Sequence, residues 1–390
     1  MPAPVAVAQL LGCLSQTIPL AAIRSALTKT GRGERRRRAL PAALVVQLVI
    51  GLGLVADAAS RQVLAYLLPA AAKLPTKKSI GRARYRVGPR PLIELFRALA
   101  RPLATLGRVP QAFYRGLRLV ALDATVVDLP DTPANERIFG RRRTPRGRAA
   151  FPQAKLITLL EVGVHAVFDL LVRPHRRHEL IPGLALVRRS VRRGMLVLWD
   201  RGFYSFTMVQ AILEQGAHFL GRAKANIVLE PAARLSDGSY LADVYPSPYA
   251  RRYQRDGLRV RVLEYRVGRQ GELIRLVTSL LDPQLDPALA LATLYHERWE
   301  IELVYDEFKT HQLGRPNGQH VAIRAHGPPA VVQEIYGLVL AHRVVRTAML
   351  AAAVREGIDP DRLSFKNALV IVRRHLPELA RAGKRRLPPF

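Results

Sequence analysis

The run from Leu117 to Leu129, LRLVALDATVVDL, constrains the fold more than any other stretch of this chain. Its apolar residues fall on both alternating faces, which is typical of a central strand in a sheet covered by helices on two sides. One carboxylate, Asp123, lies in the middle of the run. A buried carboxylate costs on the order of several kcal/mol unless it is paired or metal-bound. The sequence therefore predicts an α/β sheet with Asp123 as a functional residue.

A second carboxylate follows another short apolar run. Met195–Trp199 (MLVLW) predicts a buried strand, and Asp200 comes directly after it, before a glycine turn and a helix through Glu214. Open α/β sheets place their ligand sites at the carboxyl ends of strands, so Asp200 is a second candidate. The alternative is that Asp200 only caps the following helix.

A third candidate lies in a row of polar residues near the end of the chain. Tyr295, Arg298, Glu302 and Lys309 follow one another at steps of 3, 4 and 7 residues, which puts them in one stripe of a helix. A second stripe is apolar: Leu294, Ile301, Tyr305 and Phe308. We expect the helix to bury the apolar stripe and present the polar one. Carboxylates hold hard divalent cations, and Arg, Lys and Tyr suit phosphate oxygens. The alternative is a solvated face with an Arg298–Glu302 ion pair.

The overall charge points to a polyanionic partner. The 390 residues, enough for two or three domains, include 61 Lys+Arg against 30 Asp+Glu, a net charge of +31. Such a field attracts nucleic acid, with an anionic membrane as the weaker alternative. A coding bias towards arginine is the competing explanation. The one cysteine, Cys13, excludes a disulfide framework and a multi-cysteine zinc site within one chain, and it fits a reduced cytoplasmic setting.

We expect no membrane segment. Ala39–Ala56 is long and apolar enough to be a marginal candidate. Pro41, Gly51 and Gly53 interrupt it and Asp57 follows at once, so it predicts a buried helix instead. The first residues lack the basic region and cleavage site of a signal peptide.

The first 110 residues predict a helical domain with basic connections. The expected helices lie near Val5–Leu14, Pro19–Thr28, Pro41–Ala56, Arg61–Leu68 and Pro91–Leu106. One connection carries Arg35–Arg38, and a later one carries Lys77, Lys78, Arg82, Arg84, Arg86 and Arg90. Short helices with basic turns suit a DNA-binding module of helix-turn-helix type. The alternative is a solvated basic loop on an ordinary helical domain.

The remaining segments fill in an α/β pattern. An arginine-rich loop is expected at Asn135–Ala150, and a β-rich region without Trp at 225–285. The other expected elements are a hairpin of Lys155–Glu161 with Val164–Val172, a helix at Glu179–Arg193, a strand at His218–Lys224 and a helix at Val331–Val354.

The row Tyr295-x2-Arg298-x3-Glu302-x6-Lys309 resembles the signature of the IS4 family of bacterial insertion-sequence transposases. In that family the Glu is the last member of a DDE metal-binding triad on an RNase H-like fold. The spacing matches without a gap.

The other family motifs appear in the expected order. Asp123-Ala124-Thr125 resembles the first-acid motif D-G-T, with Ala124 as a departure, and D-R-G-F-Y-S from Asp200 is very close to the second-acid motif. The basic stretches at 35–41 and 75–88 resemble the N-terminal domain that accompanies the family.

The resemblance implies an α/β fold in which helices flank an RNase H-like mixed sheet, with a β-rich insertion and an all-helical N-terminal domain. The implied domains are a helical DNA-binding domain at 1–110, a first catalytic part at 111–224, the insertion at 225–285, a second catalytic part with the Glu helix at 286–325, and a C-terminal helical region at 326–390.

The implied function is metal-dependent cleavage at transposon ends and strand transfer into target DNA, as in cut-and-paste transposition. Asp123, Asp200 and Glu302 would hold two Mg²⁺ ions, with Mn²⁺ as an alternative metal. Asp306, one turn after Glu302, is the fallback third acid. The expected partner is double-stranded DNA, bound by a homodimer on paired ends, in the bacterial cytoplasm at the nucleoid.

Seven residues are expected to contact DNA: Tyr295, Arg298, Lys309, Arg201, Lys77, Lys78 and Arg84. Two other functions stay open. One is a catalytically silent DNA-binding regulator derived from a transposase. The other is an RNase H-type nuclease, which shares the metal site but does not predict the basic N-terminal domain.

Overall fold

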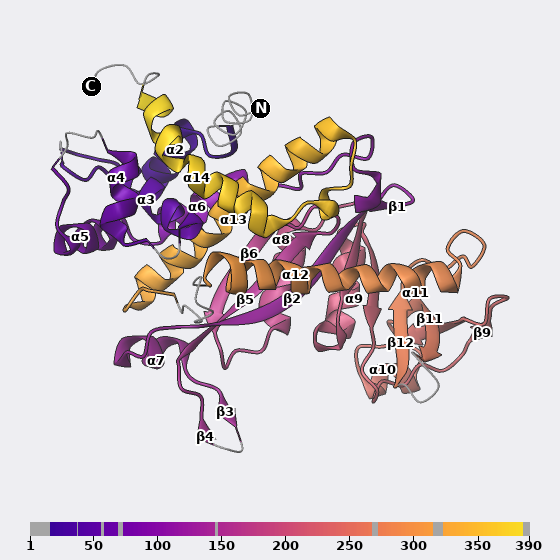
Figure 1. Ribbon diagram of the computed structural model, residues 1–390. Helices are drawn as coiled ribbons and strands as arrows, with labels where there is room; N and C mark the ends of the chain where they lie inside the picture. The colour runs from indigo at the N-terminus through magenta and orange to yellow at the C-terminus, as the bar shows by residue number, and fades with distance from the viewer. Residues whose placement is uncertain are drawn as a thin grey trace.

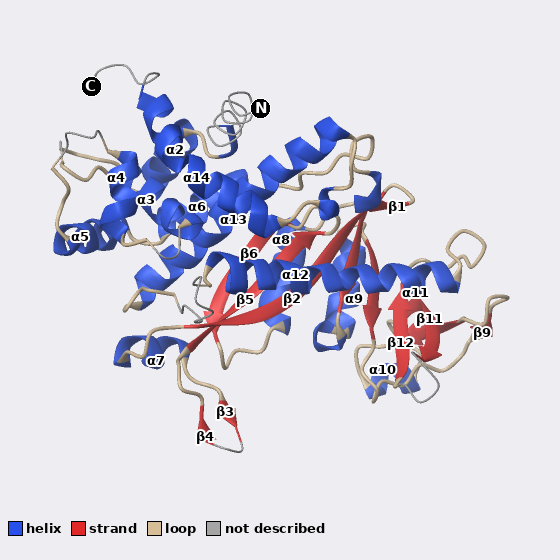
Figure 2. Ribbon diagram, viewed as in Figure 1, coloured by secondary structure: helices blue, strands red, loops and turns tan. Residues whose placement is uncertain are grey.

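The structure, a computed structural model, describes residues 16–36, 38–55, 58–68, 73–144, 147–266, 272–314 and 323–384. The helix expected at Val5–Leu14 lies outside these residues. One mixed sheet with helices on both faces organises the described chain (Figures 1 and 2). Its strand order is β6-β5-β2-β7-β8-β12-β11-β10-β9, and the short β1 (Phe113–Tyr114) pairs with β2.

The central strand is the one the sequence predicted. β2 (Leu117–Asp128) pairs antiparallel with β5 (Gln153–Glu161) and parallel with β7 (Met195–Trp199). β5 forms a hairpin with β6 (Ala166–Pro174), and β7 pairs in parallel with β8 (His218–Arg222). The predicted hairpin and both short strands are therefore confirmed, with ends shifted by one or two residues.

The two apolar faces of β2 enter two different cores. Leu119 and Ala121 pack in the core that includes Ile301 of the Glu helix, whereas Val120 and Leu122 pack in the core under α8 (Leu180–Ser190) and α9 (Phe206–Glu214). Alternation places Asp123 on the first of these faces, towards the Glu helix. This explains why the sequence of β2 is apolar on both sides.

The region at 225–285 is β-rich, as expected, and it extends the central sheet. It contains β9 (Ala233–Arg234), β10 (Tyr240–Val244), α10 (Pro248–Arg252), β11 (Leu258–Arg266) and β12 (Leu273–Thr278). β12 pairs antiparallel with β8 through Leu276–Arg222, Val277–Gly221 and Thr278–Leu220. The insertion and the catalytic strands therefore share one hydrogen-bonded sheet.

The N-terminal helices gather at one end of the molecule, beside α13 (Pro328–Glu356) and α14 (Phe365–Lys384) (Figure 1). They are α2 (Leu20–Lys29), α3 (Ala42–Leu54), α4 (Ser60–Leu67), α5 (Lys77–Val87) and α6 (Arg90–Leu99). The prediction of an all-helical domain is confirmed for the described residues. Within them α13 alone is long and apolar enough to cross a membrane, and 67% of its apolar window is buried inside the protein, as in a core helix.

The basic segment that begins at Lys77 is a helix, so its prediction as a connection was wrong. The Thr76 hydroxyl accepts a hydrogen bond from the Ser79 amide at 3.2 Å and caps the first turn. Ile80, Ala83 and Val87 bury one stripe of the helix, and a glycine with positive φ follows. The helix was missed in the sequence because its apolar stripe is narrow and most of its other residues are basic.

The arginine-rich segment at 135–150 also has more structure than expected. It begins inside α7 (Pro133–Phe139) and continues into a small hairpin of β3 (Arg143–Thr144) and β4 (Gly147–Arg148), which projects away from the sheet (Figure 1). Thr132 caps α7 by accepting from the Asn135 amide at 3.2 Å. The buried Phe139 anchors its last turn.

The Glu helix, the segment that carries Glu302, combines α-helical, 3₁₀ and π-helical turns without a break and crosses the sheet beside β2 (Figure 1). It runs through α11 (Ala288–His296), a 3₁₀ turn (Glu297–Trp299), α12 (Glu300–Asp306) and a π-helical turn (Glu307–Gln312). Three further 3₁₀ turns are η1 (Pro110–Ala112), η2 (Arg201–Phe203) and η5 (Pro360–Arg362).

Candidate active site

Two of the predicted acids come next to each other where the parallel pairing of two neighbouring strands ends. The last pair of β2 and β7 is Leu122 with Trp199; Asp123 follows in the middle of β2, and Asp200 follows directly after β7. Adjacent strands are about 4.8 Å apart. The Asp200 carboxylate also accepts the Gly202 amide at 2.8 Å, which fixes the turn after β7.

The Asp123 carboxylate is in an environment that disfavours its charge. Burial raises the pKa of Asp123 to about 7, and the charges of Asp200 and Glu179 act in the same direction. A 2.7 Å hydrogen bond from the Ala124 amide and the nearby Arg298 guanidinium oppose this increase. Burial is thus the main reason that the ionised carboxylate is disfavoured, and a bound cation would stabilise the ionised form.

Arg298 connects the first and third predicted acids. Its Nη1 atom lies 3.7 Å from Oδ2 of Asp123, and its Nη2 atom lies 3.9 Å from Oε1 of Glu302. The guanidinium is buried, whereas the Glu302 side chain is 51% exposed. Glu302 thus lies at the open side of the same site, with Arg298 between it and Asp123.

The two other residues of the row also face the sheet. The Tyr295 hydroxyl donates to the carbonyl oxygen of Trp199 at 3.1 Å, and Nζ of Lys309 donates to Oγ1 of Thr125 at 2.6 Å. Burial raises the pKa of Tyr295 to about 12 and lowers the pKa of Lys309. The polar stripe was expected to face outwards, and for the buried Tyr295 and Arg298 that expectation was wrong. The Trp199 carbonyl is the partner of Tyr295, and the Asp123 carboxylate is a partner of Arg298.

Asp306 lies outside this arrangement. Its side chain is 55% exposed, accepts a hydrogen bond from Thr310 and lies 3.7 Å from the His311 imidazole. Glu302, not Asp306, is joined to Asp123 through Arg298.

A separate set of residues brings metal-ligating atoms close together. Among the described residues, only His165, Glu300 and Asp361 place such atoms within 4.8 Å of one another. The guanidinium of Arg346 donates to Nδ1 of His165, so the neutral ring carries its hydrogen on Nε2. This nitrogen, 3.3 Å from Glu300, is then a donor instead of a ligand. We interpret the set as a buried polar network around His165 that is distinct from the predicted triad.

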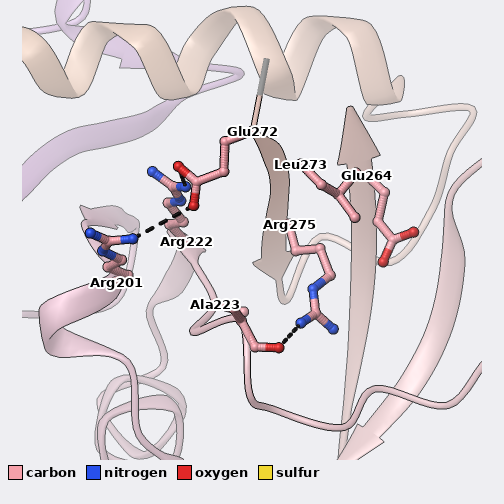
Figure 3. Close-up of a pocket in the computed structure, with 8 residues that line it drawn as sticks. Arg201, Arg222, Ala223, Glu264, Glu272, Leu273 and Arg275 are labelled. Carbon is pink, nitrogen blue, oxygen red and sulfur yellow. Dashed lines mark hydrogen bonds and ion pairs between the residues drawn. The ribbon is translucent and has the colours of Figure 1, made fainter. Parts of the chain in front are cut away.

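Arg201 lies next to Asp200 at the edge of a cavity of about 370 Å³ (Figure 3). Its guanidinium is 3.6 Å from the Glu272 carboxylate, which also lies 2.7 Å from the guanidinium of Arg222. The cavity is lined by Arg201, Arg222, Ala223, Ala225, Glu264, Glu272, Leu273 and Arg275. It lies where the insertion meets the catalytic strands.

The N-terminal candidates for DNA contact have different surroundings. Lys77 and Lys78 are exposed at the start of α5. Arg84 instead donates to Gln333 at 2.9 Å and pairs with Glu334 at 3.3 Å, so it joins α5 to α13.

Comparison with known proteins identifies related sequences over almost the whole chain. Residues 114–343 match the family described as Transposase DDE domain, and residues 8–97 match Insertion element 4 transposase N-terminal. The transposase InsG for insertion sequence element IS4 of Escherichia coli (strain K12) is 28% identical over 374 residues, which cover 94% of this chain and 83% of that protein. The putative transposase InsZ of the same organism is 28% identical over 219 residues, 55% of this chain and 73% of that protein.

A solved structure shows the same type of fold. The piggyBac transposase in its synaptic complex with hairpin DNA aligns with a TM-score of 0.50 at 10% identity, covering 98% of this chain and 82% of that chain. At this identity the likeness concerns the fold alone.

Proposed function

The chain belongs to the transposase family with a DDE domain and an IS4-type N-terminal region, and on that premise we propose that Asp123, Asp200 and Glu302 are its catalytic acids. The family function is DNA transposition, which breaks and joins phosphodiester bonds. The observation that carries the assignment of the acids is the adjacency of Asp123 and Asp200 on β2 and β7, with Arg298 linking Asp123 to Glu302.

The donor set fits a hard divalent metal. Three carboxylates offer only oxygen atoms, and burial, the largest cause of the raised pKa of Asp123, favours a bound counter-ion beside that carboxylate. We propose Mg²⁺ as the resident metal, with Mn²⁺ as the alternative, and two ions in the active state. When bound, such a pair supplies an activated nucleophile and stabilises the leaving oxygen of an in-line displacement.

The residues of the Glu helix would have different tasks. Arg298 compensates Asp123 and Glu302 in the metal-free protein, and we propose that it moves to a DNA phosphate when cations bind. Lys309, close to Asp123 through Thr125, is the second phosphate contact. For Tyr295, the bond to the Trp199 carbonyl supports positioning of Asp200 in place of the phosphate contact expected from the resemblance.

The N-terminal domain would hold the DNA outside the active site. Lys77, Lys78, Arg82 and Tyr85 are exposed along α5, at spacings that suit one helix face. We propose that this face, with Arg201 at the active site, contacts double-stranded DNA. Arg84 is assigned to holding α5 on α13.

We further propose a homodimer on paired transposon ends, acting in the bacterial cytoplasm at the nucleoid. The proposed domains follow the expected boundaries at 110, 224, 285 and 325, and the pairing of β12 with β8 joins the insertion to the catalytic sheet.

The decisive experiment combines the purified protein with DNA carrying the ends of its own element. Short inverted repeats that flank the gene define those ends. Mg²⁺-dependent nicking at the repeats supports a transposase, whereas specific binding without nicking supports the silent regulator. Cleavage of RNA–DNA hybrids in preference to these ends supports the RNase H-type nuclease.

A further inference from the structure

A fourth carboxylate lies beside Asp123 and Asp200. Glu179 immediately precedes α8, the helix that packs with α9 under the sheet. Its side chain does not cap this helix. No motif in the sequence marks it, because it is remote along the chain from Asp123.

Gly202 provides the space that Glu179 occupies. A Cβ atom placed on Gly202 would lie 2.7 Å from Oε1 of Glu179 and 3.1 Å from Oδ1 of Asp200. The two carboxylate oxygens are therefore no farther apart than the sum of these distances. Any side chain at position 202 would displace Glu179, since the first distance is far below van der Waals contact.

The charge around Glu179 is arranged as at a site for an ionic ligand. Its Oε2 atom lies 3.4 Å from Nζ of Lys155, and the two residues line a cavity of about 300 Å³ together with Thr125 and Arg142. Lys155 thus pairs with Oε2 of Glu179, whereas Oε1 of Glu179 lies on the side of Gly202 and Asp200.

We propose that the Glu179 carboxylate is a fourth oxygen donor to the divalent metal ions held by Asp123 and Asp200, admitted to this position by the absence of a side chain at Gly202. The inference rests on the proposed function, because it presupposes that the two aspartates hold metal. Asp200, which follows β7, and Glu179, which precedes α8, would then face the same cation from different elements.

A purely structural role makes the opposite predictions. If Glu179 serves only as the partner of Lys155, Glu179→Gln lowers the stability of the metal-free protein and leaves metal affinity unchanged. If it is a metal ligand, Glu179→Gln removes like charge from a crowded site, so the metal-free protein is at least as stable as wild type, while metal affinity falls.

The test measures Mn²⁺ binding by isothermal titration calorimetry to the purified full-length protein without DNA, together with the thermal unfolding midpoint in EDTA. We expect Glu179→Gln and Gly202→Ala to weaken Mn²⁺ binding about 10- to 100-fold, the usual effect of losing a supporting group at a metal site. Gly202→Ala keeps every charge and displaces mainly Glu179, since the added Cβ would lie 2.7 Å from Oε1 of Glu179 and 3.1 Å from Oδ1 of Asp200. The matched control is Glu230→Gln, a 74% exposed carboxylate paired with Arg251.

The outcomes separate this inference from the proposed function. If Asp200→Asn loses Mn²⁺ binding while Glu179→Gln and Gly202→Ala bind as wild type does, the fourth donor is refuted and the transposase site stands. If Asp123→Asn and Asp200→Asn also bind Mn²⁺ as wild type does, the metal site itself is wrong and both proposals fail. Lys155→Gln, which leaves Glu179 free, is expected to retain Mn²⁺ affinity.

Discussion

The guanidinium of Arg298 lies 3.7 Å from the carboxylate of Asp123, although the two residues belong to a helix and a central strand that are far apart in the sequence. The contact gives the metal-free site an internal cation. It also joins the Glu helix to β2 beside the proposed catalytic acids.

Replacing any of the three acids with its amide should abolish strand cleavage. We expect Asp123→Asn, Asp200→Asn and Glu302→Gln each to reduce Mg²⁺-dependent nicking of element ends at least about 1,000-fold, as for residues that act as a unit. DNA affinity in a mobility-shift assay should be retained, because binding depends on cations elsewhere. Asp306→Asn is the control and should cleave normally. Wild-type activity in any of the three acid variants contradicts the assignment.

Removing Arg298 should destabilise the metal-free protein more than the metal-bound one. Arg298→Gln leaves Asp123 and Glu302 without their shared cation, which divalent ions would replace. We expect a lower thermal midpoint than wild type in EDTA and a smaller difference in saturating Mg²⁺. The exposed Arg97→Gln serves as control. An equal loss in both conditions indicates that Arg298 has only a packing role.

Tyr295→Phe tests whether Tyr295 acts on Asp200 or on DNA. The change removes the hydrogen bond to the Trp199 carbonyl, so we expect a loss of about 1 kcal/mol in stability and weaker Mn²⁺ binding, with unchanged DNA affinity. Calorimetry and fluorescence anisotropy measure the two affinities. Weaker DNA binding with unchanged metal affinity favours the phosphate contact instead.

Two cations of α5 should behave differently when removed. Lys78→Ala should weaken DNA binding and reduce the slope of log affinity against log salt by about 1, as expected for a phosphate contact. Arg84→Ala should instead destabilise the protein, because it removes one of the cations that pair with the buried Glu334 and the guanidinium that donates to Oε1 of the buried Gln333. Chemical denaturation and anisotropy at several salt concentrations distinguish the two effects. An exchange of these phenotypes overturns the proposed roles.

Glu307 should make stability depend on pH in the acidic range. Burial would raise the pKa of Glu307, but the His165 and His342 imidazoles and the Arg346 guanidinium outweigh it and hold that pKa well below its usual value. Its stabilisation is then complete above the unfolded pKa of about 4.3 and is lost as the pH falls below it.

Glu307→Gln should therefore cost about 3–5 kcal/mol at pH 7, since it leaves buried cationic partners, and less at pH 3.5. Urea unfolding at both pH values measures this difference. Glu94→Gln, which breaks an exposed pair with Lys29, should cost less than about 1 kcal/mol at pH 7. A difference between wild type and Glu307→Gln that grows on acidification contradicts the prediction.

The strand that carries Asp123 and the strand that precedes Asp200 could be predicted from the sequence, because runs of buried apolar residues identify them. The apolar alternation around Asp123 defined a central strand, and the end of the run before Asp200 defined its neighbour, since burial on both faces leaves a direct mark on the sequence. The position of Glu179 could not be predicted, because it depends on how the start of α8 packs over the turn at Gly202. The pairing of β12 with β8 was equally hidden, since strand partners distant in the chain share no pattern.

The continuity of that sheet has a mechanical consequence. Because β12 and β8 exchange backbone hydrogen bonds, the insertion is a stiff extension of the frame that carries Asp123 and Asp200. A nucleotide held by the insertion would lie at a fixed distance from the bond to be cut. Hydrogen-bonded strands about 4.8 Å apart, and not a linker, would determine that distance. The width of the sheet between the outer strands and the two aspartates would then set how far the cut lies from that nucleotide.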